Sequence, residues 1–537
     1  MTFDVVVVGS GPSGAQAAKE AAEAGLDVAM LDVGFDDPDL AASIPRGSFA
    51  ELRRTDPEQR RYFLGFEGET DADVNDRVGG HFTPPRSYIK RGVRELAPVS
   101  SDSFFPEMSL ALGGLGAGWG SGAQVFEDFE LERAGLPVEA MRECYDEVAS
   151  DIGVSGSLED DTAATSVPRC VQSPSAIDTN ALAIMARYGR RRSAMHARNF
   201  LLGRAPLAML TETMHRGTRW ERGANPYEDM DFYGESARSI YRPKYTIEEL
   251  RANPRFRYIG NALVERFEDG ADGTIACYRD VRDGSEGSLS ARRILLAANP
   301  INTARIALRS ARAIGARQPL LCNPYHYVVT ANLAMLGRPA SDRRHSLAQL
   351  VGSLTPAHRG EEHVFAAFFS YRSLMHFRLV REMPLSPGAG LLLSRALMNA
   401  LTIVGVHHPE SPTDRKWVRL ATDGIIEASY ALGSDEEAAI AGDLHELRRV
   451  LMDLRCIPLS TIATPPGSSI HYAGTIPISR GDGDPALTTA PDGRLSGSPN
   501  VYVADSSGWR YLPAKGPTLT MMANARRVAK AAIATLR

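Results

Sequence analysis

The sequence predicts an α/β protein in which a domain with a parallel sheet is joined to a second domain built on a large, mostly antiparallel sheet. Two patterns support this prediction. Near the N-terminus, an apolar run is followed by a glycine-rich turn, an alanine-rich helical segment and a second apolar run, which is the order of a βαβ unit. In the second half of the chain, strand-like segments are separated by long polar connections, and this favours antiparallel pairing.

The composition limits the class of protein. The chain has 537 residues, with 60 basic and 65 acidic side chains and a net charge of −5, so it is long enough for about three or four units, or two larger ones. The ordinary composition excludes a collagen, a coiled coil or a mainly disordered chain. The acidic excess argues against nucleic acid as a partner.

Cysteines and hydropathy bear on compartment and metal binding. The five cysteines are scattered without a CxxC pair, so neither a disulfide framework nor a metal site is expected. No run approaches the roughly 18 apolar residues of a membrane span, and the N-terminus lacks the features of a signal peptide. We therefore expect a cytoplasmic protein that does not bind membranes.

The first βαβ unit is expected within the first 34 residues. Phe3–Val8 is a continuous apolar run, typical of a strand buried on both faces. A helix is predicted over Ala15–Gly25, and Leu26–Leu31 forms the second strand. This unit predicts a Rossmann-like domain at the start of the chain.

The turn of this unit has the spacing of a dinucleotide site. Gly9, Gly11 and Gly14 are spaced as GxGxxG: the first makes the tight turn, the second lets the backbone approach a pyrophosphate, and the third lets the helix pack on the strand. Pro12 and Ser13 belong to the same turn, and the helix N-terminus that follows it offers free N–H groups to a phosphate. Asp32, at the end of the second strand, is placed to accept a hydrogen bond from a ribose 2′-hydroxyl, which disfavours NADP. This segment alone does not distinguish FAD from NAD.

The later elements follow from apolar periodicity and turn residues. Residues from about Asp36 to Pro98 are polar and irregular and are expected to form an excursion or lid, and Gly113–Gly122 is a second glycine-rich segment. Helices are predicted over Val138–Ile152, Asn302–Arg312, Asp435–Leu454 and Pro517–Leu536. Strands are predicted over Phe256–Phe267, Thr274–Val281, Ser290–Ala298, Tyr325–Ala334, Val364–Ser370, Ala400–Val406, Lys416–Ala431 and Val501–Val503.

Four regions of the chain carry a resemblance to a known family. They are Val5–Gly14 with Asp32, the segment Gly113–Gly120, the segment Ile294–Arg305, and a C-terminal region containing His471–Thr475, Asn500–Ser507 and Gly516–Thr520. Together they resemble the glucose–methanol–choline (GMC) oxidoreductases, which are FAD-dependent alcohol oxidoreductases. Asn299 stands where the family usually has glycine, and asparagine tolerates a positive φ better than most residues.

The resemblance implies a divided architecture and a cofactor. It implies an FAD-binding domain assembled from residues 1–160, 254–316 and 465–537, and a substrate domain from residues 161–253 and 317–464. No histidine lies within Gly113–Phe126, where some members attach their flavin, so noncovalent FAD is expected. Trp119 is either a flavin-side packing residue or ordinary core. Beyond the N-terminal turn, the cofactor residues implied are Gly113, Gly114, Gly118, Trp119, Gly120, Val264 (through its backbone, to the adenine), Ala298, Asp505, Ser506, Pro517 and Thr518.

The family's chemistry requires a base beside the substrate hydroxyl. His471, in the motif H-x-x-G-T, is the candidate, because an imidazole with a pKa near 6.5 can be neutral before the reaction and cationic during it. The family usually has Asn or His immediately before the proline of the last motif, and here that position is Gly516. Lys515 beside it could supply a cation, or a water could fill the gap, although a surface lysine in a turn is the simpler interpretation of Lys515. Gly516 could instead make room for a bulky substrate. His407 and His408 end a strand and could face the pocket, but a hydrogen-bonded loop pair is the simpler interpretation.

The substrate is less well defined by the sequence. A polar excursion and an acidic balance favour a hydrophilic alcohol, and the composition resembles that of members similar to paromamine 6′-oxidase, which oxidise a primary alcohol of an aminoglycoside sugar. A carbohydrate oxidase of the pyranose-oxidase kind is an alternative. A non-redox flavoprotein, similar to the hydroxynitrile lyases of this fold or a binding protein, is another. The motifs do not distinguish oxygen from another carrier as electron acceptor, and they leave the oligomeric state open.

Overall fold

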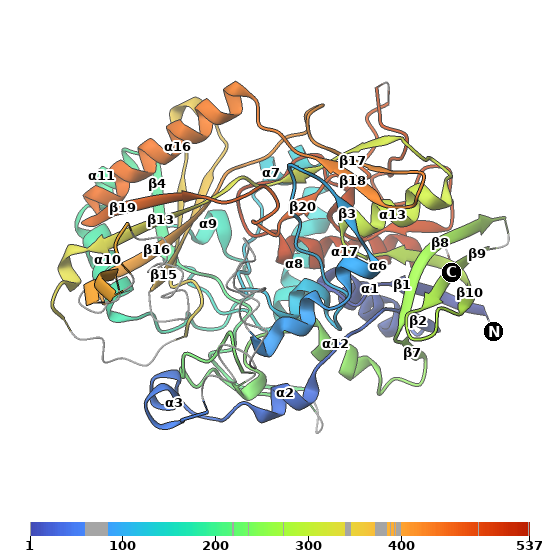
Figure 1. Cartoon of the computed structure of the whole chain (residues 1–537), viewed down its shortest axis with the longest axis horizontal. Coiled ribbons are helices and arrows are strands. Elements are labelled where there is room, and N and C mark those ends of the chain that lie inside the picture. Colours follow the sequence, from blue (N-terminus) through green and yellow to red (C-terminus); the bar gives the residue numbers. More distant parts are fainter. Residues whose placement is uncertain are drawn as a thin grey trace.

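The protein is described here by a computed structural model that covers residues 2–58, 84–216, 220–234, 236–271, 273–338, 345–370, 384–386, 388–390, 392–393, 399–481, 483–534 and 536. Two large sheets form its framework (Figure 1). This confirms the predicted mixed α/β architecture with large sheets. The sequence boundaries proposed for the two domains remain a prediction.

One large sheet has seven strands, in the order β7-β2-β1-β10-β9-β8, with β21 also pairing with β10. Strands β7, β2, β1, β10 and β21 run parallel, whereas β9 and β8 form an antiparallel extension. Their bounds are β1 Thr2–Val8, β2 Val28–Leu31, β7 Phe256–Ile259, β8 Ala262–Gly270, β9 Gly273–Asp280, β10 Glu286–Leu296 and β21 Val501–Val503.

Both faces of this sheet are covered by helices, as the continuous apolar run of β1 predicts. On one face, Val5 and Val7 pack with the alanine-rich side of α1 (Pro12–Glu23) and with α17 (Thr518–Ala534). On the other face, Val6 and Val8 pack in a cluster with α13 (Pro300–Ser310). The alternation follows from the period of two along a strand.

Several predicted boundaries near this sheet differ from the observed ones, and two of the differences have a clear physical reason. The first helix begins at Pro12, earlier than predicted, because proline at the first helical position has a φ already suited to the helix. The segment Phe256–Phe267 is not one strand: Gly260 and Asn261 interrupt it, and Asn261 has a φ of +58°. The chain therefore leaves β7, beside β2, and enters β8 at the opposite edge of the sheet.

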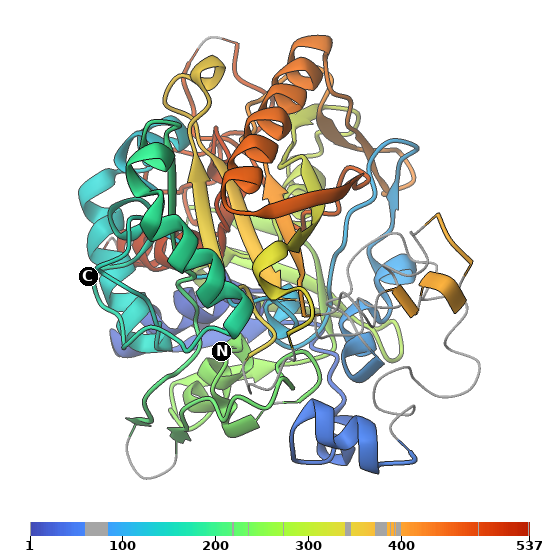
Figure 2. The ribbon, with the colours of Figure 1, turned by 90° about the vertical axis from the view of Figure 1, so that its left-hand side faces the viewer.

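The second large sheet has six strands, in the order β19-β13-β16-β15-β14-β4, and every adjacent pair is antiparallel. Helices α10 (Thr179–Arg190) and α16 (Ser434–Asp453) cover one face (Figure 2). On β15, Val364, Ala366 and Phe368 point to these helices, so the residues between them lie on the other face. The strands are β4 Phe200–Arg204, β13 Tyr325–Asn332, β14 Leu350–Leu354, β15 Val364–Ser370, β16 Leu401–His407 and β19 Cys456–Ala463.

A third predicted boundary is wrong, in a smaller sheet. Lys416–Ala431 is not one strand but a hairpin of β17 (Trp417–Leu420) and β18 (Ile426–Ser429), which lies outside both large sheets. The hairpin turn includes Gly424, whose φ is +82°. This sheet also contains β3 (Val99–Ser100) and β11 (Arg317–Pro319), and two-stranded pairs are formed by β12 (Leu321–Cys322) with β20 (Tyr472–Ala473) and by β5 (Met214–Arg216) with β6 (Trp220–Arg222).

The polar stretch predicted as an excursion contains short helices where it is described. Residues 59–83, which belong to the predicted excursion or lid, lie outside the described residues. No helix in the described part of the chain is both long and apolar enough to cross a membrane. The remaining α-helices are α2 Pro38–Ser43, α3 Phe49–Thr55, α6 Val93–Leu96, α7 Asp128–Ala134, α8 Val138–Ile152, α9 Ala163–Ser166, α11 Arg192–His196 and α12 Pro243–Leu250.

Candidate active site

The turn between β1 and α1 is shaped by three glycines with different roles. Gly9 has a φ of +97°, and a Cβ added there would lie 2.6 Å from the carbonyl oxygen of Ala297. A Cβ on Gly14 would lie 1.9 Å from the carbonyl oxygen of Gly9. The nearest atom to a Cβ on Gly11, whose φ is −62°, would be the carbonyl oxygen of Gly113 at 4.0 Å. Gly9 and Gly14 are therefore required for packing, whereas Gly11 borders open space that a side chain would fill.

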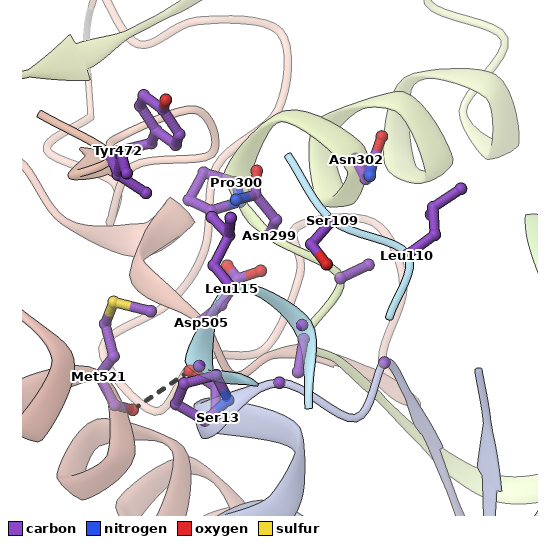
Figure 3. Close-up of a pocket in the computed structure, with 18 of the residues that line it drawn as sticks. Ser13, Ser109, Leu110, Leu115, Asn299, Pro300, Asn302, Tyr472, Asp505 and Met521 are labelled. Carbon is purple, nitrogen blue, oxygen red and sulfur yellow. Dashed lines mark hydrogen bonds between the residues drawn. The ribbon is translucent and has the colours of Figure 1, made fainter. Parts of the chain in front are cut away.

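The N-terminus of α1 faces that same space. The helix has no side-chain cap at Gly11, and Pro12 and Ser13 line the cavity in front of it. The Ser13 hydroxyl donates instead to the carbonyl oxygen of Met521 at 3.4 Å (Figure 3). Free N–H groups and the positive end of the helix dipole favour an anion here. The open space at Gly11 and these donors fit a pyrophosphate.

Asp32 is held at the end of β2 by two hydroxyl groups. Ser10 Oγ and Tyr258 Oη donate to Asp32 Oδ2 at 2.5 Å and 3.0 Å. Burial raises the pKa of Asp32 to about 6, and the hydrogen bonds from Ser10 and Tyr258 oppose that rise. Asp32 also lines the cavity, where its carboxylate can accept a hydrogen bond from a ribose hydroxyl.

The second glycine-rich segment packs directly against the first. Ser10 Oγ accepts a hydrogen bond from the Gly113 N–H at 2.9 Å, and a Cβ on Gly114 would lie 3.3 Å from Gly11 Cα. Gly113 and Gly114 have φ values of +91° and +56°, which favour glycine. Trp119 Nε1 donates to the carbonyl oxygen of Tyr241 at 2.8 Å, so this indole is anchored at the cavity wall.

A cavity of about 430 Å³ joins these segments to the six-stranded sheet. Its size lies within the range of cofactor and ligand sites, roughly 300–1,000 Å³. Figure 3 shows Asn299, Pro300, Asp505 and Tyr472 among the residues around it. Its other end is lined by the face of the six-stranded sheet that α10 and α16 leave uncovered, including Val351, Phe365, Ala367 and Phe369.

The return to the parallel sheet contributes a second buried carboxylate. Asp505 accepts hydrogen bonds from the hydroxyls of Thr303 and Ser507 at 2.6 Å and 2.5 Å, and burial raises its pKa. Asn299 has a φ of +78° and caps α13 by accepting from the Ile301 N–H at 3.1 Å. Asparagine tolerates such a positive φ better than most residues.

His471 lies in the cavity wall with a defined hydrogen-bond partner. Its Nδ1 is 3.1 Å from Asn323 Oδ1. The Asn323 amide nitrogen donates to the carbonyl oxygens of His408 at 2.8 Å and Pro513 at 3.1 Å, which fixes the amide oxygen toward the histidine. Nδ1 therefore carries the imidazole proton, and Nε2 keeps its lone pair.

Burial and local strain also act on His471. Burial lowers its pKa to about 3, so the ring is neutral at pH 7 and can accept a proton. The preceding residue, Ile470, has a φ of +63°, a conformation that is rare for a β-branched residue. Such strain costs roughly 1–3 kcal/mol and persists where the surrounding structure requires it. Here it presents the next side chain, His471, to the cavity.

A second histidine, which the sequence did not identify as a site residue, stacks on the first. The rings of His407 and His471 have centroids 4.6 Å apart and an interplanar angle of 19°, and Tyr325 stacks on the opposite side of His407 at 4.2 Å. All three line the cavity. His408 instead hydrogen-bonds to Asp443 at 2.7 Å. The interpretation as a loop pair is thus correct for His408 and wrong for His407.

Lys515 is turned away from the cavity. Its ammonium is fully buried and donates to Glu127 and Glu130, both at 2.7 Å, and to the carbonyl oxygen of Thr165 at 2.5 Å. It does not line the cavity. The predicted role as a cation for the substrate, and the interpretation as a surface lysine, are both corrected: this lysine neutralises two glutamates inside the protein.

The cavity nevertheless gathers most of the predicted site residues. Four do not line it: Gly14 and Gly113 pack behind the glycine turns, Ser506 donates to the carbonyl oxygen of Tyr472 at 2.7 Å, and Lys515 has the partners described above. Those that line it are Gly9, Gly11, Pro12, Ser13, Asp32, Gly114, Gly118, Trp119, Gly120, Val264, Ala298, His471, Asp505, Gly516, Pro517 and Thr518.

Comparison with known families agrees with this geometry. The model of the FAD binding domain family matches residues 4–47, which contain most of β1 and all of the glycine turn, α1, β2 and Asp32. FAD is the cofactor of this protein. The match supports a flavin-dependent oxidoreductase. No curated protein matches the sequence.

Proposed function

We propose that this protein is a GMC-type oxidoreductase whose Rossmann-like domain holds noncovalent FAD and which oxidises a CH–OH group to a carbonyl. The observation that carries the proposal is the tautomer of His471. A neutral imidazole with its proton on Nδ1 lies in the same cavity as the glycine turn that fits a pyrophosphate. Such a ring can accept a proton at Nε2.

When bound, FAD supplies the two-electron acceptor for the hydride that leaves the substrate carbon. The glycine turn and Asp32 hold the nucleotide half, and Asp505 also lines the cavity. His471 accepts the hydroxyl proton at Nε2, which is typically worth about 10²–10⁴-fold in rate. Asn323 acts as a positioning residue, because its oxygen keeps the proton on Nδ1 before the reaction and faces the imidazolium afterwards.

For the substrate, the proposal is a sugar or aminoglycoside with an oxidisable hydroxyl, such as a 6′-hydroxymethyl group. The wall formed by β14 and β15 contributes apolar side chains, including Val351 and Phe365. A pyranose ring has an apolar face of C–H groups, which can lie against such a wall while a hydroxyl reaches His471. Oxygen or another carrier then reoxidises the flavin.

The test is anaerobic flavin reduction by a panel of primary and secondary alcohols, starting with aminoglycoside precursors and hexoses. Loss of the oxidised flavin absorbance by at least one alcohol is expected, and His471→Ala should slow it by at least about 10²-fold. His445 provides a matched control, because it lies on α16 outside the cavity lining, and His445→Ala should keep the native rate. A flavin that no alcohol reduces would contradict the proposal and favour a non-redox flavoprotein.

A further inference from the structure

A buried carboxamide lies between two glycines at the cavity wall. Gln124 is 3% exposed and lines the cavity. Its Oε1 lies 2.6 Å from the position of a Cβ on Gly516 and 2.9 Å from that of a Cβ on Gly122. Neither glycine has a positive φ, so their backbone conformations do not require glycine. The two glycines instead leave the space that this side chain fills.

The backbone around Gln124 is fixed on both sides. The Ala123 N–H donates to the carbonyl oxygen of Pro206 at 2.9 Å, and the Val125 N–H donates to that of Ser166 at 3.1 Å. These bonds orient the side chain of the residue between them. Position 124 is therefore a defined part of the cavity wall.

The carboxamide itself has no hydrogen bond to any residue that the structure describes. Gln349, a comparably buried glutamine, makes a useful contrast: its Oε1 accepts from the Asp178 N–H at 2.9 Å, and its Nε2 donates to the carbonyl oxygen of His345 at 2.9 Å. The Gln124 amide borders the cavity, so its hydrogen-bonding capacity is available to what the cavity holds, and a polar group without a protein partner at such a wall calls for an explanation. A binding role explains why a polar group is kept at this wall.

We propose that Gln124 binds the substrate, its NH₂ group donating a hydrogen bond to the oxygen of the alcohol that His471 deprotonates. This inference rests on the proposed function. In that reaction the O–H bond breaks and its proton passes to His471 Nε2, the C–H bond breaks and its hydride passes to FAD, and a C=O bond forms. The oxygen gains negative charge before the carbonyl is complete, so a donor aimed at it lowers the barrier. Lys515 does not supply this donor, because Glu127 and Glu130 hold its ammonium.

Gly516 lies directly beside the Gln124 carboxamide. The resemblance described above places an Asn or His side chain at this position, and here the adjoining space contains the Gln124 carboxamide. We infer that a polar group from another segment has replaced the one missing at 516. A side chain at position 516 would require the Gln124 carboxamide to move aside or to be shortened.

The experiment compares the native holoenzyme with Gln124→Met, Gln124→Ala and the double variant Gln124→Ala/Gly516→Asn. The readout is the limiting rate of anaerobic flavin reduction with an alcohol that reduces the native protein. Both single variants should reduce flavin about 10²-fold more slowly, the loss typical of one missing donor. The double variant, which returns a carboxamide to the same space, should recover at least tenfold of that loss.

A second readout does not depend on activity. Gln124→Met removes an unbonded amide and should leave the melting midpoint of the substrate-free protein unchanged or higher, whereas the control Gln349→Met breaks existing hydrogen bonds and should lower it. Native reduction rates in both single variants, or a marked fall in the melting midpoint of Gln124→Met, would overturn the inference while leaving the proposed function intact. If no alcohol reduces the native flavin, the proposed function fails and this inference fails with it.

Discussion

Replacing Gly11 by alanine should weaken FAD binding without unfolding the protein. Gly11 has a φ of −62°, which alanine adopts without strain, and the nearest described atom to an added Cβ, apart from its chain neighbours, would be the Gly113 carbonyl oxygen at 4.0 Å. The free energy of unfolding of the FAD-free protein should therefore change by less than about 0.5 kcal/mol. The new methyl group, however, would occupy the space in front of the α1 N-terminus that fits the pyrophosphate.

The loss in affinity can be worked out from steric overlap. Forcing extra methyl groups into a packed site typically costs about 1–3 kcal/mol, which corresponds to a roughly 5- to 150-fold higher Kd for FAD. The assay is titration of the FAD-free variant with FAD, followed by flavin fluorescence, together with chemical denaturation of the FAD-free protein.

Gly14→Ala is the matched control at the same turn. Its Cβ would lie 1.9 Å from the Gly9 carbonyl oxygen, so it should displace α1 and destabilise the FAD-free protein by about 1–3 kcal/mol or more. Native FAD affinity in Gly11→Ala, or equal destabilisation by the two substitutions, would refute the assignment of Gly11 to the cofactor site.

Three further predictions concern buried titratable groups. Lys515→Met leaves Glu130 buried without its cation and should lower the free energy of unfolding by about 3–5 kcal/mol. The folded variant should keep the native rate of flavin reduction. An unchanged melting midpoint in thermal unfolding would contradict this prediction. His407→Phe keeps a ring stacked on Tyr325 and removes a buried nitrogen, Nδ1, that has no hydrogen bond to the described residues. The melting midpoint of the variant should therefore stay unchanged or rise. A large fall in the melting midpoint would contradict this prediction. Burial lowers the pKa of His471 from its ordinary 6.5 to about 3 in the folded protein. Between these two pH values the unfolded chain binds more protons than the folded protein, so the free energy of unfolding falls as the pH drops. Chemical denaturation should show that, from pH 7 to pH 4, the free energy of unfolding of the native protein falls by up to about 3 kcal/mol more than that of His471→Gln. Equal decreases in the two proteins would contradict the lowered pKa.

The local backbone features of the site could be predicted from the sequence. The glycines of the first turn, Asp32 and the helix that follows are governed by short-range rules of φ, helix N-termini and strand ends. The antiparallel sheet followed from apolar runs and polar connections. The splitting of Phe256–Phe267 was missed because Asn261 reaches a positive φ inside an otherwise strand-like run.

The side chains that complete the site could not be predicted, because their partners are distant in sequence. Asn323 and His471 are separated by 148 positions, and only the fold brings the amide to Nδ1. His407 ends a strand that is apolar on both faces, so alternation does not reveal which face borders the cavity. Lys515 was misassigned because Glu130, which neutralises it, lies 385 positions earlier.

The most direct measurement is a crystal structure of the protein with FAD bound. We predict that the pyrophosphate lies at the N-terminus of α1 beside Gly11. The isoalloxazine ring should lie in the part of the cavity that His471 borders, with His471 Nε2 facing the substrate side of the ring. An isoalloxazine bound elsewhere, or His471 turned out of the cavity, would contradict it.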